Sequence, residues 1–203
     1  YDNDPIGYEL VWVNDGSDQE HTQILEEELV QFMETVRFMK LKYCKLESNQ
    51  GVANALKIGV ENCSYEFIAR MDADDIMKSN RLITQYNYMM ENPGLALCGT
   101  GIYMFRDSLK TGIQKFHPGI IRHGTPEASQ NWISNHPTFM MRKSMILAVG
   151  NYRNTKSTKD REDRDLLGRI LETYQEIHNL PKILLYYRIH PGQITHGQGV
   201  VII

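Results

Sequence analysis

The sequence predicts an α/β fold in which a mostly parallel sheet is flanked by helices. Strand and helix patterns alternate through the first half of the chain, the order that gives parallel strands with helices packed on the sheet faces. Clusters of polar residues follow the expected strands, at the edge where open α/β sheets place ligands. With 203 residues and 41% hydrophobic content, the chain can bury a sizeable core, and we expect a single domain.

The elements expected in the first half follow from the spacing of apolar residues. They are a strand at 9–13, a helix whose apolar residues lie within 25–36, a strand at 41–46, a helix whose apolar face lies within 52–59 and a strand at 65–71. The first helix carries its apolar residues on one face, namely Leu25, Leu29, Phe32, Met33 and Val36. Turn residues at 14–17 close the first strand, and Ser17 or Asp18 can cap the helix that follows.

The second half is expected to alternate regular elements with longer loops. The elements are a helix over 82–89, a strand at 95–105, a strand at 138–141, a short helix ended by Gly150, a helix from about Glu162 and a strand at 183–189. Asn92-Pro93-Gly94 stops the first of these helices. Periodicity vanishes over 106–131, so we expect a long surface excursion there, which is functional or mobile.

Composition excludes several classes of protein. The net charge is -3, from 22 basic and 25 acidic residues without a basic stripe, which argues against nucleic acid as a partner. Cys44, Cys63 and Cys98 are scattered, which disfavours a zinc site or a disulfide framework and favours a reducing compartment. No apolar run approaches the roughly 20 residues of a transmembrane helix, and Tyr1-Asp2-Asn3-Asp4 lacks a signal-peptide pattern. We expect a soluble cytoplasmic protein, for which peripheral contact with a membrane surface stays open.

Three carboxylates follow directly on the strand at 65–71. Asp72, Asp74 and Asp75 are close enough that mutual repulsion raises at least one pKa, unless a divalent cation or an arginine compensates. Arg70 can pair with Asp72 or touch substrate, and the two roles are equally open. A D-x-D at the end of a strand is expected where a metal clamps a nucleotide diphosphate. A solvated turn or a helix N-cap remains an alternative.

Several further motifs resemble those of one enzyme family. They are Val13-Asn14-Asp15-Gly16-Ser17, Asn49-Gln50-Gly51, Asn92-Pro93, Gly99-Thr100-Gly101, His136-Pro137-Thr138, Gly150-Asn151-Tyr152-Arg153, Arg161-Glu162-Asp163-Arg164-Asp165 and Tyr187-Arg188-Ile189-His190. With Asp72-Ala73-Asp74-Asp75, and from Tyr8 through His190, the chain resembles the inverting glycosyltransferases of family 2. That resemblance implies the GT-A fold, which is Rossmann-like.

The resemblance implies a divalent cation, Mn²⁺ or Mg²⁺, at the acidic run. Asp74 is the expected metal ligand, and Asp72 is expected to contact the metal or the ribose of the donor. As the glycosidic bond breaks, negative charge grows on the departing diphosphate, and a divalent cation stabilises that charge. Arg188 and His190 match a late Arg-x-His that reaches the diphosphate or the metal, although His190 also fits a surface position. Asp75 can simply cap the turn that follows.

The same resemblance implies a nucleoside site near the start of the chain. Asp15 corresponds to an aspartate that accepts a hydrogen bond from the base, typically uracil, although a turn that ends the strand explains it almost as well. Asn14 replaces the more common first aspartate of that pair. Asn49 and Gly51 match residues that lie under the nucleoside. Lys57 is equally suited to touch ribose or phosphate and to remain a solvated helix lysine.

Glu162 and Asp163 resemble an acidic pair in which the second residue is the catalytic base. Inversion by single displacement needs a carboxylate within hydrogen-bond reach of the attacking hydroxyl, and Asp163 can take that part. Glu162 is expected to bind acceptor hydroxyls and Asp165 to support the fold. The alternative is that these acids favour a helix N-terminus through its dipole. His136 is a weak acceptor-site candidate, because a structural histidine explains it as well.

The expected function is therefore metal-dependent inverting transfer of a hexose or N-acetylhexosamine. The donor is expected to be a UDP-sugar and the acceptor a hydroxyl on a glycan or lipid-linked glycan. We expect one domain over 1–203, with 8–105 binding the nucleotide-sugar and 106–203 the acceptor. Two rivals are a sugar-nucleotide nucleotidyltransferase and a non-catalytic nucleotide-sugar or glycan-binding module. Oxygen ligands suit both Mn²⁺ and Mg²⁺, so the sequence leaves the ion open.

One expected part of the family fold is missing from this sequence. Members of the family carry a strand and a helix ahead of the turn at 14–17, and that strand is central in the sheet. The chain starts too late to include them. A core without a central strand would leave a neighbour's backbone groups unpaired. The chain is a fragment, or residues were omitted, or the donor site is crippled. We expect omitted residues rather than a natural deletion.

Overall fold

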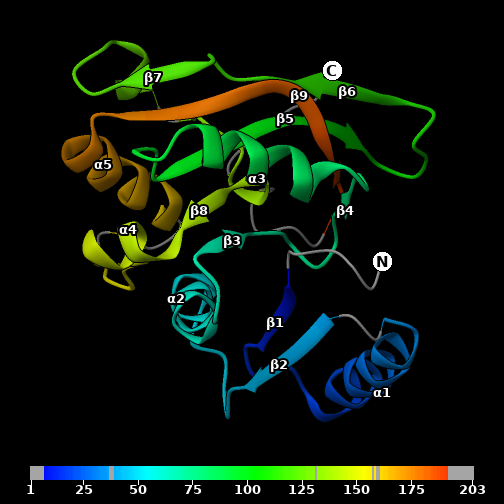
Figure 1. Ribbon diagram of the computed structural model, residues 1–203. Coiled ribbons are helices and arrows are strands. Elements are labelled where there is room, and N and C mark those ends of the chain that lie inside the picture. The colour runs from blue at the N-terminus through cyan, green and yellow to red at the C-terminus, as the bar shows by residue number, and fades with distance from the viewer. Residues whose placement is uncertain (1–6, 37–38, 131, 157, 159–160, 192–203) are drawn as a thin grey trace. The chain divides into compact units, whose positions relative to one another are not determined.

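The computed structural model describes residues 7–36, 39–130, 132–156, 158 and 161–191 (Figure 1). The strands are β1 (Tyr8–Asn14), β2 (Met39–Lys45), β3 (Phe67–Ala69), β4 (Ile76–Met77), β5 (Leu97–Phe105), β6 (Gly112–Lys115), β7 (Ile120–Arg122), β8 (Met140–Arg142) and β9 (Glu176–Arg188). The helices are α1 (Gln19–Thr35), α2 (Val52–Asn62), α3 (Arg81–Glu91), α4 (Lys143–Ala148) and α5 (Glu162–Tyr174), with 3₁₀ turns at Glu127–Ser129 and His136–Thr138. No helix among the described residues is long and apolar enough to cross a bilayer.

The chain forms two compact units. Unit 1 comprises Tyr1–Ile68 and Lys143–Arg169, and unit 2 comprises Ala69–Arg142 and Ile170–Ile203. Two of the three boundaries fall inside β3 and α5, and the third lies between β8 and α4. Each unit therefore draws segments from both of the halves that the sequence suggested.

Unit 1 contains a parallel pair of strands, β1 and β2, in register from Tyr8↔Met39 to Asn14↔Lys45. Asp18 is the N-cap of α1, as the sequence allowed, and its carboxylate accepts the backbone N–H of His21 at 2.9 Å. The expected apolar face of α1 is only partly covered: Leu29 is buried, but Phe32 is 40% exposed. A narrow pair of strands offers less surface than a helix of 17 residues can cover.

The strands that lie wholly in unit 2 form a sheet with the order β8-β5-β9-β4, in which β6 also pairs with β5 and β7 with β9. β5 and β9 are parallel, whereas β6 and β8 on β5, and β4 and β7 on β9, are antiparallel. The predicted α/β class, a sheet flanked by helices, is confirmed. The pairings make this sheet mixed.

Two parts of the sheet differ from the sequence prediction. β9 starts at Glu176, well before the expected strand at 183–189. The prediction missed the first part of the strand because Pro181, which has no backbone N–H to donate, interrupts the pattern. A register shift between Thr100 and Gly101 accommodates the interruption. The segment 106–131, expected to be irregular, contributes β6 and β7. These strands are short and mostly exposed, so they carry no alternating apolar pattern.

In unit 2, α3 packs against β5 (Figure 1). Met89 is fully buried, as expected, but the other fully buried positions of α3 are Arg81 and Gln85. Arg81 donates to the carbonyl of Arg70 at 2.6 Å and to Gln85 Oε1 at 2.9 Å. Gln85 in turn donates to the carbonyl of Thr138 at 2.8 Å. The burial of Arg81 and Gln85 was not predicted, because charged and amide side chains rarely occupy the core unless their polar groups are hydrogen-bonded.

Candidate active site

The three carboxylates that follow β3 converge in unit 2. Asp72, Asp74 and Asp75 each place one oxygen within 4.8 Å of the other two. The run turns tightly, since the backbone N–H of Asp75 donates to the carbonyl of Asp72 at 3.3 Å. Asp72 and Asp74 are partly exposed and Asp75 is buried. Like charges this close repel unless a cation or a proton relieves them.

Asp75 is the most constrained of the three. Its Oδ1 accepts the backbone N–H of Arg188 at 3.0 Å. Its Oδ2 is buried and has no hydrogen-bond partner among the residues that the structure describes. Burial, opposed by the Arg188 N–H and reinforced by the charges of Asp72 and Asp74, raises the pKa of Asp75 to about 7. A buried oxygen without a donor is costly, and a hard cation would satisfy it.

Strand pairing brings the late Arg-x-His to these carboxylates. β4 pairs with β9 through Ile76↔Tyr186, so the residues after Tyr186 run alongside the acidic run. Arg188 Nε donates to the carbonyl of Asp74 at 3.0 Å. His190 Nε2 lies 2.9 Å from Asp74 Oδ2. The structure thus brings together residues 116 positions apart in sequence.

Arg70 forms the ion pair that was one of its two expected roles. Its guanidinium donates twice to the carboxylate of Asp72, at 2.8 and 2.5 Å. The Arg70 side chain is only 9% exposed, so the pair is partly desolvated. This two-pronged contact fixes the orientation of Asp72. Contact between Arg70 and a donor stays a prediction.

The groups at this site fit a divalent cation. They offer carboxylate oxygens from Asp72, Asp74 and Asp75, together with the imidazole of His190. Mg²⁺ prefers such oxygen ligands, Mn²⁺ accepts both oxygen and imidazole, and both ions usually keep several waters. The backbone that carries the carboxylates is held by Arg188 and, through Arg70, by Arg81. A cation would therefore meet ligands that are already in place.

His136 lies in a 3₁₀ turn of the same unit. Its ring packs edge-on against Phe139, with centroids 5.1 Å apart. Burial, helped by the charge of Arg70, holds the pKa of His136 well below its usual value, so the imidazole is neutral. The packing agrees with the structural alternative for this residue. Its contact with an acceptor stays a prediction.

The polar residues expected to bind the nucleoside meet in unit 1. The carboxylate of Asp15 accepts the backbone N–H groups of Gln50 and Gly51, at 2.8 and 2.9 Å. Asn49 Oδ1 also accepts from Gly51, at 3.1 Å. Gly51 is the N-cap of α2, has φ +89° and makes no side-chain cap, so Asp15 holds the backbone just ahead of the helix. Hydrogen bonding from Asp15 to a base stays a prediction.

Asn14, rather than Asp15, closes the turn that ends β1. Its Oδ1 accepts the backbone N–H of Ser17 at 2.9 Å, and its Nδ2 donates to Thr22 and Tyr43 at 3.1 and 3.0 Å. Gly16 lies against the backbone of Ser48, where a Cβ would overlap the main chain. The turns at 14–17 and 48–51 are therefore in direct contact.

Lys57 projects from α2 and pairs with Glu61 of the same helix, at 3.0 Å. Both side chains are more than 40% exposed (43% and 44%), so the pair contributes little to stability. Lys57 is thus a solvated helix lysine, which is one of the two interpretations that the sequence left open. A contact with ribose or phosphate stays a prediction.

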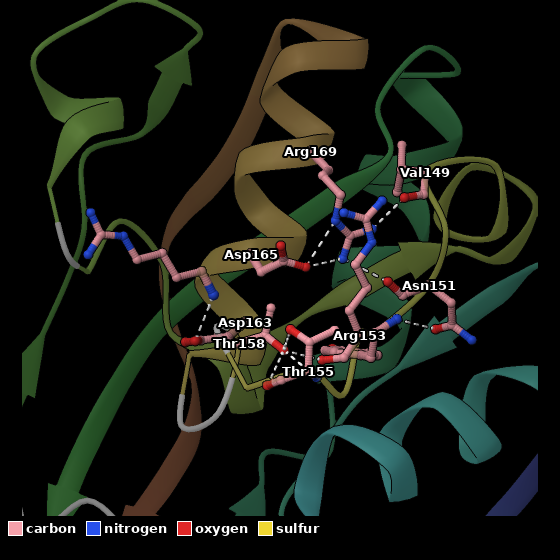
Figure 2. A network of polar contacts seen from close by, with 10 residues as sticks. Val149, Asn151, Arg153, Thr155, Thr158, Asp163, Asp165 and Arg169 are labelled. Atoms are coloured by element: carbon pink, nitrogen blue, oxygen red, sulfur yellow. Dashed lines mark hydrogen bonds and ion pairs between the residues drawn. The ribbon is translucent and has the colours of Figure 1, made fainter.

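The acidic pair Glu162 and Asp163 opens α5, as predicted. Asp163 Oδ1 accepts the backbone N–H of Arg164 at 2.7 Å, and both acids are partly exposed. One turn later, Asp165 pairs with Arg169 at 2.6 Å (Figure 2). The i,i+4 spacing of Asp165 and Arg169 is a signal that sequence reasoning could have used but did not.

A family model places the chain among known proteins. The model for glycosyl transferase family 2 matches residues 2–150. The chain is 35% identical over 153 residues to the O-antigen biosynthesis glycosyltransferase WbnJ of Escherichia coli, covering 74% of this chain and 58% of that protein. It is 29% identical over 154 residues to the amylovoran biosynthesis glycosyltransferase AmsE of Erwinia amylovora, covering 76% and 56%. The chain thus spans little more than half the length of these relatives.

A solved structure supports the same fold. The crystal structure of S. aureus TarS 1-349 in complex with UDP-GlcNAc superposes with a TM-score of 0.71 at 18% identity. The match covers 96% of this chain and 53% of that one. Since the family model covers most of the sequence and the fold agrees with it, the chain belongs to glycosyl transferase family 2.

Proposed function

We propose that the protein is a metal-dependent inverting glycosyltransferase. It moves a hexose or N-acetylhexosamine from a UDP-sugar to a hydroxyl of a glycan or lipid-linked acceptor. The observation that carries the proposal is the acidic cluster, in which buried Asp75 keeps one oxygen without a donor among the described residues. The relatives named for O-antigen and amylovoran biosynthesis support a glycan product, and the UDP-GlcNAc complex of TarS supports a UDP-sugar donor.

The acidic cluster is proposed to bind the cation that in turn holds the donor diphosphate. Asp74, Asp72 and Asp75, with His190, would hold Mn²⁺ or Mg²⁺. When bound, such a cation stabilises the negative charge that grows on the departing diphosphate. Arg188 holds the backbone of Asp74 and the N–H of Arg188 holds Asp75, so the ligands need little rearrangement. A site organised in advance spends less free energy on ordering as the ligand binds.

The nucleoside is proposed to bind in unit 1, at the two turns that contact each other. Asp15 and Asn49 order the backbone of Gly51, beside which the base and ribose would lie. Gly51 presents no side chain, and a Cβ there would meet open space. Lys57, two turns along α2, is the proposed contact for ribose or phosphate.

Asp163 is proposed to accept the proton of the attacking acceptor hydroxyl. The hydroxyl oxygen attacks the anomeric carbon from the side opposite to the leaving diphosphate, and this single displacement inverts the configuration. Removal of the proton makes the oxygen a better nucleophile, and a positioned carboxylate contributes about 10² to 10⁴ in rate. Glu162 is proposed to bind acceptor hydroxyls, and His136 to order the floor of the acceptor site.

The base assignment has a direct test. Asp163→Asn should lower transfer by about 10²-fold or more, because the amide cannot accept the proton. Binding of UDP with Mn²⁺ should stay within about twofold of wild type. Glu172→Gln, an exposed position on the same helix, is the matched control and should transfer normally. Full transfer by Asp163→Asn would rule out this residue as the base.

The donor and the metal can be tested together. A thermal-shift panel of UDP, GDP, dTDP and CDP, each with Mn²⁺ and with EDTA, should show stabilisation by UDP only when metal is present. A shift with UDP in EDTA would contradict metal dependence, and a shift with another nucleotide would change the proposed donor. Consumption of a nucleoside triphosphate with release of pyrophosphate would favour the nucleotidyltransferase instead.

We propose that the enzyme works in the cytoplasm, where a lipid-linked acceptor would bring it to the membrane surface. Cys44, Cys63 and Cys98 are free thiols. Burial raises the pKa of Cys63 to about 11 and that of Cys98 to about 12, so both stay protonated and unreactive. Free thiols, of which Cys98 is buried, support a reducing compartment.

A further inference from the structure

We propose that Arg169 is a positioning residue for the transfer step. Its hydrogen bonds fix the loop between α4 and α5, and this loop fixes the position of Asp163 relative to the turn at Gln50 and Gly51. The α4–α5 loop comprises the segment after Ala148 and before Glu162, of which 149–156, 158 and 161 are described. The proposal rests on the proposed function, because it takes Asp163 as the base.

Arg169 uses one guanidinium to join three points of unit 1 (Figure 2). Its Nε and Nη2 donate to Asp165 Oδ2 at 3.0 and 2.6 Å. Its Nη2 donates to the carbonyl of Asn151 at 2.8 Å, and its Nη1 donates to the carbonyl of Val149. The side chain is 11% exposed, so these charge-assisted bonds are shielded from water. Lysine could not reproduce them, because it lacks the planar fork.

The two carbonyls belong to the turn that follows α4 and ends the helix. The N–H of Gly150 bonds to the carbonyl of Leu147 and that of Asn151 to the carbonyl of Ile146, at 3.0 and 2.9 Å. This is a Schellman motif, in which glycine takes the left-handed conformation, here φ +90°. Asn151 is also left-handed, with φ +55°, which is unfavourable for a residue with a Cβ. Such a conformation persists where surrounding contacts determine it.

Two asparagines of the loop contact the part of unit 1 where the nucleoside is proposed to bind, namely the turn at 48–51 and α2. Asn151 Nδ2 donates to the carbonyl of Lys57 in α2 at 3.2 Å. Asn154 Nδ2 donates to the carbonyl of Gln50 at 3.1 Å. Asp15 holds the backbone N–H of the same Gln50. The loop therefore contacts both the turn proposed to lie under the nucleoside and the helix that follows it.

The far end of the loop leads into the turn that carries Asp163. Thr158 Oγ1 accepts the N–H of Thr155 at 2.9 Å and donates to the carbonyl of Arg153 at 2.7 Å. The carbonyl of Thr158 accepts the N–H of Arg161 at 3.0 Å, and the carbonyl of Arg161 accepts the N–H of Asp165 at 3.0 Å. Asp163 thus lies between two anchors, Thr158 before it and the Asp165 pair with Arg169 after it.

Loss of Arg169 should misplace the base without removing any group that binds the donor. A misplacement of about 1 Å can cost 10²-fold in rate. Arg169→Met should therefore lower kcat by about 10- to 100-fold. It should weaken the affinity for UDP with Mn²⁺ by a smaller factor, up to about threefold, because the turn at Gln50 and Gly51 loses support from the loop while Asp15 still holds its N–H groups. Asp165→Asn should act in the same direction and more weakly, because the two carbonyl contacts of Arg169 remain.

The first test measures amide hydrogen exchange on the full-length protein, with no substrate. Arg169→Met should raise exchange at 149–155 and also at Gln50 and Gly51, because the loop holds that turn. An increase confined to 149–155 would overturn the proposed link to the nucleoside side. Glu172→Gln is the control and should change neither segment. If Arg169→Met does not fold, the same comparison is made with Asp165→Asn.

The second test separates positioning from general weakening of the fold. Transfer to water from UDP-GlcNAc and from UDP-Gal, each with Mn²⁺, is followed as release of UDP. In an Asp163→Asn background, Arg169→Met should cause no further loss of rate, because there is no base left to misplace, while its cost in stability should be unchanged. A full additional loss would overturn the proposal. Full activity of Asp163→Asn alone would instead refute the base assignment, and the exchange result would still decide the link.

Discussion

Removal of the Asp75 charge should stabilise the metal-free protein at alkaline pH. The pKa of this carboxyl is about 7 in the folded protein against an ordinary value of 3.8. Because the folded state holds the proton more tightly, the stability contributed by this group falls as pH rises from about 4 to about 7 and stays low above that range. The full penalty is about 4 kcal/mol, from roughly three units at 1.36 kcal/mol each. Of this, roughly 1.7 kcal/mol is already present at pH 5.

Urea denaturation of wild type and Asp75→Asn in EDTA, at pH 5 and pH 8, is the measurement. The gain from the substitution should be larger at pH 8 than at pH 5 by about 2 to 3 kcal/mol. With Mn²⁺ at pH 8, wild type should be stabilised and Asp75→Asn much less, since the amide is a poor substitute for the carboxylate. Glu172→Gln should show no such pH dependence. An equal effect of Asp75→Asn at both pH values would refute the reasoning.

Two further changes test the framework of the site. Arg81→Met should cost about 2 to 5 kcal/mol, because it leaves two acceptors, the carbonyl of Arg70 and Gln85 Oε1, without their donor at about 1 to 3 kcal/mol each. Urea denaturation gives the cost, and a loss below about 1 kcal/mol would mean that these hydrogen bonds are dispensable. Gly16→Ala should destabilise the protein by about 2 kcal/mol or more, because φ is +71° and a Cβ would overlap the backbone of Ser48. Gly168→Ala, a helical position with open space around it, is the matched control and should gain up to about 1 kcal/mol.

The acidic cluster illustrates how a binding site can reduce the stability of the protein that carries it. Asp75 is buried beside two other carboxylates, and one of its oxygens meets no donor among the described residues. In the proposed enzyme, cation binding would recover this cost. Metal binding and folding stability should therefore be linked, with a proton released as the cation enters.

Local pattern was sufficient to predict several elements of the fold. β5 runs over Leu97–Phe105, inside the predicted strand at 95–105, because most of it is buried and its residues are largely apolar. α5 begins at Glu162, where acidic residues precede an apolar helical face. The prediction that polar residues cluster after the strands also agrees with the structure, at Asp15 and at Asp72 to Asp75.

Other elements left no local signal. β6 and β7 are strands because β5 and β9 offer them edges, and their own side chains are largely exposed. The first half of β9 was hidden by Pro181, which the register shift tolerates. Arg81 and Gln85 are core residues because several backbone carbonyls happen to point at them. In each case the deciding contact comes from outside the segment itself.

The sequence by itself determined the family, the types of chemical group and the points along the chain where they occur. Carboxylates after a strand and acids at a helix start are local features, so their positions could be read directly. Only the tertiary structure decided that Asp75 is the buried carboxylate, that Arg70 pairs with Asp72 and that His190 reaches Asp74. Burial and pKa depend on which segments cover a group, and the pairing of β4 with β9 that brings His190 there joins residues more than a hundred positions apart.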